Sequence, residues 1–109
     1  MTTLVETMTK IEAQARIVYI VGESSTGLLK VGISKNANSL ARRLQNLQTG
    51  NPRELKILTT FNYGQEGLAY SVEQDTIKAF SMYQYGLAGD WFDTTIQALT
   101  AYIMGGILP

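Results

Sequence analysis

The chain has 109 residues, of which 45% are hydrophobic and 17% charged, a composition typical of one globular domain. Nine basic residues balance nine acidic ones, which argues against a strongly basic nucleic-acid binder but allows a small basic patch. There is no cysteine and no histidine, which excludes disulfides, thiolate zinc sites and serine–histidine catalysis. Any chemistry must therefore use tyrosine, lysine, arginine, carboxylates or a hard metal ion.

The N-terminal segment has acidic residues early and no continuous apolar core, so it does not resemble a signal peptide. No apolar run approaches the roughly 18 residues of a membrane span. We therefore expect a cytoplasmic protein with no membrane partner. Apolar residues recur at helical spacing in residues 1–15, which predicts an accessory helix ahead of a main domain over residues 16–93.

Two strands are predicted next. Ile17–Val21 is a continuous β-branched and aromatic run, which indicates a strand covered on both faces. The turn-rich residues 22–27 connect it to a second strand over Leu28–Ser34, as in an antiparallel hairpin. Lys30 and Gly32 point to the same face of this strand, and a glycine inside a strand often marks close approach of a ligand or backbone.

A helix is predicted over Leu40–Gln48, after a polar entry at residues 35–39 that offers several N-caps. Gly50 is a plausible C-cap, and the Asn-Pro pair after it stops the helix. Arg43 borders the apolar stripe of this helix, whereas Arg42 is expected to point to water with the neighbouring Ser39 and Asn46.

A third strand at Leu55–Phe61 precedes a helix predicted over residues 67–85. Glu73 lies on the inward face of that helix, one turn from Ala69 and one turn from Ile77. A carboxylate on an inward face costs several kcal/mol, on the order of 2–7, unless it is paired, so a metal ion or Arg43 is expected beside it.

The remaining sequence predicts a short extended piece at residues 90–93 and a last helix. Thr94 or Thr95 caps this helix, which runs through Met104, and the segment 94–109 packs on the same domain. The element order predicts an α/β (α+β) fold, with a small three-stranded antiparallel sheet flanked by helices.

Four short motifs in order resemble the GIY-YIG nuclease superfamily over residues 16–93. They are Ile17-Val18-Tyr19, Lys30-Val31-Gly32, Arg43-Leu44 and Glu73. The similarity is greatest to a branch common in phage and bacterial proteins. That branch shares the lysine before the glycine, the stretch at residues 47–52 and the final Gly-acid-Trp-Phe motif at residues 89–92. The chain departs from many relatives at positions 47 and 77, where leucine and isoleucine replace polar side chains.

The resemblance implies a metal-dependent endonuclease that hydrolyses phosphodiester bonds with Mg²⁺ or Mn²⁺, in a bacterial or phage-infected cell. Its partner would be nucleic acid, most often DNA. Glu73 would bind the metal, and Tyr19 would position or deprotonate the attacking water. Arg43 and Lys30 would neutralise charge on the phosphate, with Lys30 also lowering the pKa of the phenol. Gly32 would let the substrate or a neighbouring element come close.

Two other functions stay open. One is a catalytically silent GIY-YIG-like scaffold that binds nucleic acid or protein, with Tyr19 as a core aromatic and Glu73 paired to Arg43 for structure alone. The other is a structural interaction module of a phage or mobile element, with the terminal helices making a homo-oligomeric contact. The nuclease hypothesis predicts that Tyr19, Arg43 and Glu73 converge on one concave surface with Gly32 at its floor.

Overall fold

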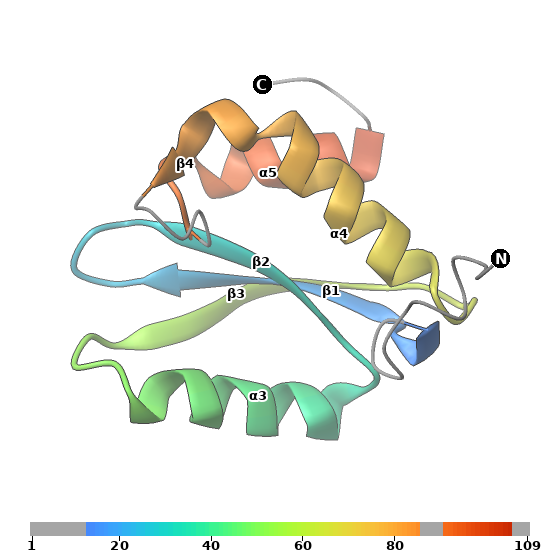
Figure 1. Ribbon diagram of the computed structural model, residues 1–109, viewed down its shortest axis with the longest axis horizontal. Helices are drawn as coiled ribbons and strands as arrows, with labels where there is room; N and C mark the ends of the chain where they lie inside the picture. The colour runs from blue at the N-terminus through green and yellow to red at the C-terminus, as the bar shows by residue number, and fades with distance from the viewer. Residues whose placement is uncertain (1–12, 86–90, 106–109) are drawn as a thin grey trace, which may run out of the picture.

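The computed structural model describes residues 13–85 and 91–105 and shows a mixed α+β fold. An antiparallel sheet lies between one helix on one face and two helices on the other (Figure 1). The elements are β1 (Ile17–Glu23), β2 (Leu29–Ser34), α3 (Ala37–Thr49), β3 (Leu55–Asn62), α4 (Leu68–Ala79), the 3₁₀ turn η1 (Ser81–Tyr83), β4 (Gln84–Tyr85), β5 (Trp91–Phe92) and α5 (Ile96–Gly105).

The central strand is β1, which pairs antiparallel with β2 on one side and with β3 on the other. All seven of its residues are buried, as its continuous apolar sequence predicts. Val18 and Ile20 pack toward α4 and α5, whereas Tyr19 and Val21 pack toward α3, following the period of two along a strand. The predicted hairpin and its third strand are confirmed.

The sheet has five strands rather than the predicted three, in the order β3-β1-β2-β5-β4. The two extra strands have two residues each, too short to show the alternation by which strands are recognised in a sequence. They form because the helix predicted over 67–85 ends at Ala79, so that Gln84 and Tyr85 can pair with β5. On β2 only Leu29 pairs with β5, so in the described residues the outer edge of Lys30–Ser34 has no strand neighbour.

Side-chain hydrogen bonds hold both ends of the helix α3. Asn36 caps its N-terminus by accepting a backbone hydrogen bond from the first turn. At the other end the Gln48 amide donates to the carbonyl oxygens of Asn51 and Arg53 and accepts from the N–H of Leu55 at 2.9 Å. This clamp gives a structural reason for Gln48, and Asn51 has its own, because its Oδ1 accepts a hydrogen bond from the N–H of Arg53 at 2.9 Å.

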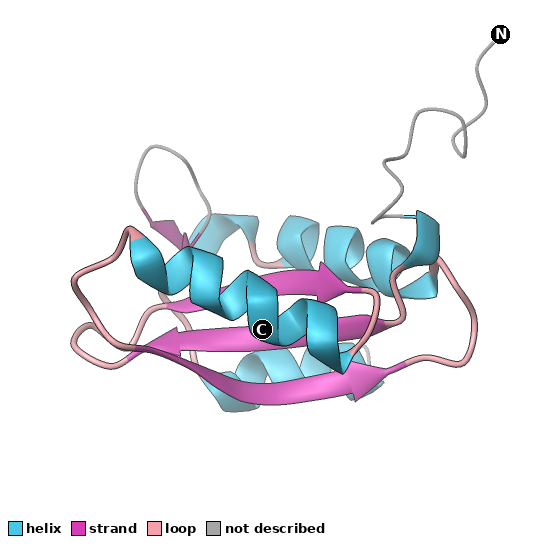
Figure 2. Ribbon diagram, turned by 90° about the horizontal axis from the view of Figure 1, so that it is seen from below, coloured by secondary structure: helices cyan, strands magenta, loops and turns pink. Residues whose placement is uncertain are grey.

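The opposite face of the sheet carries α4 and α5. Phe80, Phe92 and Leu99 form the centre of this layer, and all three are nearly inaccessible to solvent. The Thr95 hydroxyl accepts a hydrogen bond from the N–H of Ala98 at 3.1 Å, which makes it one of the two predicted caps of α5. Figure 2 looks onto α3, which lies over the strands with α4 and α5 behind them.

Some predictions fall outside the described residues. These are most of the accessory helix in residues 1–15, the first two residues of the predicted 89–92 motif and the last four residues of the chain. Within the described ranges, no helix has the length and apolar character needed to cross a membrane.

A buried carboxylate ties the hairpin to the start of β3. The Glu23 side chain is 7% exposed, and its carboxylate accepts hydrogen bonds from the Thr26 hydroxyl at 2.7 Å and from the Arg53 guanidinium at 2.8 Å. These bonds hold the pKa of Glu23 below its ordinary value. Arg53 also supplies a carbonyl to the Gln48 clamp, so the two groups of hydrogen bonds share a residue.

We expect Glu23→Gln to destabilise the fold by about 1–3 kcal/mol at pH 7, because Gln cannot form the ion pair with Arg53. A depressed pKa contributes stability that is present above the ordinary carboxyl pKa and is lost as the pH falls through the folded-state value. The variant should therefore lose less stability than the wild type on acidification below pH 4.5. Urea unfolding across this range measures both effects. Glu54→Gln is the control, since it breaks an exposed ion pair with Lys56.

Candidate active site

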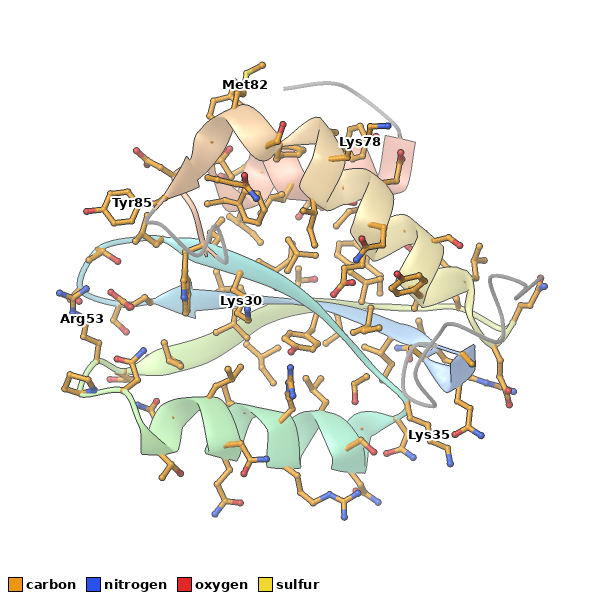
Figure 3. The ribbon with its side chains drawn as sticks, in the orientation of Figure 1. Lys30, Lys35, Arg53, Lys78, Met82 and Tyr85 are labelled. Carbon is orange, nitrogen blue, oxygen red and sulfur yellow. The ribbon has the colours of Figure 1, made fainter. Side chains whose placement is uncertain are left out.

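A cleft of about 620 Å³ opens along β2. Five residues singled out from the sequence line it: Tyr19, Lys30, Gly32, Arg43 and Glu73. They come from β1, β2, α3 and α4, so segments far apart in the chain meet here. Lys30 lies over the middle of the sheet in Figure 3, on the side where α3 packs.

The floor of the cleft is built by Tyr19 and Gly32, which are direct partners in the β1–β2 ladder. A Cβ atom placed on Gly32 would lie 2.8 Å from Cε1 of Tyr19 and closer still to Cζ and the hydroxyl oxygen. The ring is 1% exposed and has no room to move away. Gly32 is therefore needed for the neighbouring tyrosine to lie across it.

Burial raises the pKa of the Tyr19 phenol above its ordinary value, and Glu73 raises it further. The hydrogen bond and charge of Arg43 lower it by less, so the pKa stays raised. The cation acting on the phenol is Arg43, not Lys30 as the sequence suggested. In the metal-free protein the phenol is therefore protonated at neutral pH and can donate a hydrogen bond.

One face of α3 forms a wall of the cleft. It carries Ser39, then Arg42 and Arg43 about one turn later, and Asn46 about one turn after those. Arg42 is exposed, as expected from its helix phase, and it also lines the cleft, because the wall spans a wider arc of the helix than the position bordering the apolar stripe. Both arginines are exposed and reach the cleft, so sequence phase alone could not separate them.

Glu73 reaches the cleft from the other layer of the molecule. The helices α3 and α4 cover opposite faces of the sheet (Figure 1), yet Arg43 and Glu73 line the same cleft. The helix α4 contacts β2, and in the described residues no strand pairs with the outer edge of β2 beyond Leu29. The Glu73 carboxylate is half-buried and accepts a hydrogen bond from the Gln74 amide at 2.9 Å.

The cleft concentrates positive charge. Among its described lining residues are four basic side chains, Lys30, Lys35, Arg42 and Arg43, and one carboxylate, Glu73. No group of three or more potential metal-binding carboxylates exists in the described residues. A single carboxylate fits Mg²⁺, which keeps several waters and takes phosphate oxygens as further ligands. Glu73 is therefore the residue that would hold such an ion beside a phosphate.

Positions 47 and 77 add no polar group to the cleft. Leu47 packs against the buried cluster under α3, and Ile77 packs against the cluster under α4 and α5. Both side chains stabilise the helices that carry Arg43 and Glu73. Their packing gives a structural reason for the apolar residues at these two positions.

Fold and cleft together define a small α+β domain with a basic cleft that contains one carboxylate, an arrangement suited to phosphate chemistry. The family comparison agrees with this class. The chain belongs to the T5orf172 domain family, whose model matches residues 16–104, and this family is associated with nucleases. No curated protein and no solved structure matches the chain.

We expect Gly32→Ala to destabilise the protein by about 1–3 kcal/mol, because the added methyl overlaps the buried Tyr19 ring. Denaturant unfolding followed by circular dichroism measures this change. Gly50→Ala is the matched control, since no atom lies within 4 Å of a Cβ there and its φ of −95° suits alanine. Equal stabilities of the two variants would contradict the proposed floor.

Proposed function

We propose that this domain is a metal-dependent endonuclease of the GIY-YIG type, which nicks or cuts nucleic acid by phosphodiester hydrolysis. The observation that carries the proposal is the meeting of Tyr19, Arg43 and Glu73 around Gly32 in one cleft. Membership of a nuclease-associated family supports it. DNA is the first substrate to test.

Each side chain has a role that follows from its chemistry. Arg43 binds phosphate oxygens through its planar guanidinium and stabilises charge that develops on phosphorus, with Lys30 as a second cation. The protonated Tyr19 donates a hydrogen bond that orients the attacking water or a phosphate oxygen. Glu73 would hold Mg²⁺ or Mn²⁺, which when bound would polarise water and neutralise phosphate charge.

A second candidate function is nucleic-acid binding without catalysis. The raised pKa of Tyr19 and the apolar packing of Leu47 and Ile77 favour it, because they leave the cleft with few groups that could transfer a proton. The same basic lining would serve this function. The two candidates differ in whether Glu73 is needed for turnover.

Nicking of supercoiled plasmid with Mg²⁺ or Mn²⁺ tests the proposal. We expect Glu73→Gln to abolish metal-dependent nicking with thermal stability nearly unchanged, because Gln keeps the shape but is a poor ligand for a hard cation. Arg43→Ala should slow nicking by about 10²–10³-fold, the typical effect of removing one charge stabiliser. Lys78→Ala, which removes an exposed cation on α4 that does not line the cleft, should leave the rate unchanged.

The outcome also separates the two candidate functions. Wild-type protein that binds DNA or RNA but cuts neither duplex, single-stranded nor branched substrates would support the binding scaffold. Protein that neither binds nor cuts would contradict both candidates.

A further inference from the structure

A second cleft adjoins the candidate active site. It has a volume of about 430 Å³, and Lys35 lines both clefts. Its lining also includes Arg16, Asn62 and Tyr63. In Figure 3 Lys35 lies at the turn between β2 and α3, at the opposite end of β2 from Lys30. The first cleft therefore lies along β2, and the second follows it just past the end of that strand.

The second cleft is held by the end of the sheet. The Arg16 N–H donates to the carbonyl of Ser34 at 3.1 Å, and the Arg16 carbonyl accepts from the N–H of Tyr63 at 2.7 Å. One residue further on, Ile17 pairs with both Ser34 and Asn62. Strand pairing thus fixes the backbones that carry Arg16 and Lys35, even though both side chains are exposed.

The charge of this second cleft is positive. Its described lining carries Arg16 and Lys35, the amides of Asn36 and Asn62, and no carboxylate. Arg16 forms an ion pair with Glu66 at 3.2 Å, in which the two side chains are 48% and 54% exposed. Such exposed pairs contribute little, and a guanidinium has five N–H donors, so Arg16 retains the capacity to bind a phosphate.

We propose that nucleic acid continues from the candidate active site past Lys35 into the second cleft, where Arg16 and Lys35 bind backbone phosphates that flank the scissile one. The inference rests on the proposed function for its ligand, although it requires no catalysis. A strand rises about 3.3 Å per residue, so the backbones of Lys30 in β2 and of Lys35, one residue past its end, are about 16 Å apart. That length corresponds to roughly five nucleotide steps of one DNA strand, at about 3.4 Å each.

Glu66 allows a test in which the expected change in DNA affinity is opposite to that caused by loss of Arg16. Its carboxylate occupies Arg16 and would repel an incoming phosphate, so removing its charge should strengthen binding. Glu54 offers a matched comparison, because it forms an exposed ion pair of the same 3.2 Å length with Lys56 and lines neither cleft. If loss of any negative charge raised the DNA affinity, Glu66→Gln and Glu54→Gln would raise it equally.

The experiment is fluorescence anisotropy of a labelled DNA duplex in EDTA, titrated with the full chain at several NaCl concentrations. Arg16→Ala should weaken binding by about five- to tenfold at 0.1 M salt, and should reduce the slope of log K against log salt by about 0.9. Glu66→Gln should tighten binding by about two- to threefold, and Glu54→Gln should not. Lys78→Ala is the control for loss of a positive charge outside both clefts.

Each outcome decides the question. If Arg16→Ala and Glu66→Gln change the DNA affinity no more than Lys78→Ala and Glu54→Gln do, the second cleft does not bind the nucleic acid. The proposal that the protein binds nucleic acid would be unaffected. A wild-type protein that does not bind the duplex or the corresponding single strand in EDTA would overturn this inference, which requires no metal ion, whereas the proposed function is tested separately by nicking with Mg²⁺ or Mn²⁺. Thermal unfolding of each variant verifies that the comparison is between folded proteins.

Discussion

The contact on which the site depends is the close approach of the Tyr19 ring to the backbone of Gly32. A buried aromatic ring on a central strand normally meets a side chain from the neighbouring strand. Here the partner has no side chain, so the ring lies across β2 and its hydroxyl reaches the cleft. The same ring packs into the core under α3, so the residue at the floor of the cleft also stabilises the fold.

A second constraint is the short pairing between β2 and β5, which stops after Leu29 in the described residues. Had β5 run the length of β2, a strand would separate the two helical layers along this edge. Because the edge stays open, Arg43 from one layer and Glu73 from the other line a common cleft. The short length of β5 therefore matters to the site as much as the identity of Arg43 and Glu73.

Much of this arrangement could be predicted from the sequence, because local patterns determined it. The buried run of β1, the cap-bounded helix α3 and the inward position of Glu73 each depend on neighbours within a few residues. What could not be predicted depends on contacts between distant segments. The strands β4 and β5 are defined only by their pairing. Whether Arg42 lines the cleft depends on how far the cleft extends around α3. The second cleft forms where Arg16 bonds to Ser34 at the end of β2 and to Tyr63 just after β3, which no local pattern encodes.

The carboxylate among the cations bears most directly on function. The chain has equal numbers of acidic and basic residues, yet four cations gather in one cleft, so composition understated the local charge. In a cleft that only bound phosphate, Glu73 would repel the ligand and weaken binding. In a cleft that binds phosphate together with a divalent cation, the same carboxylate holds the ion and the repulsion disappears. With no histidine in the chain, the proposed hydrolysis would depend on the position and charge of these side chains, and Glu73 is the residue whose charge distinguishes the two candidate functions.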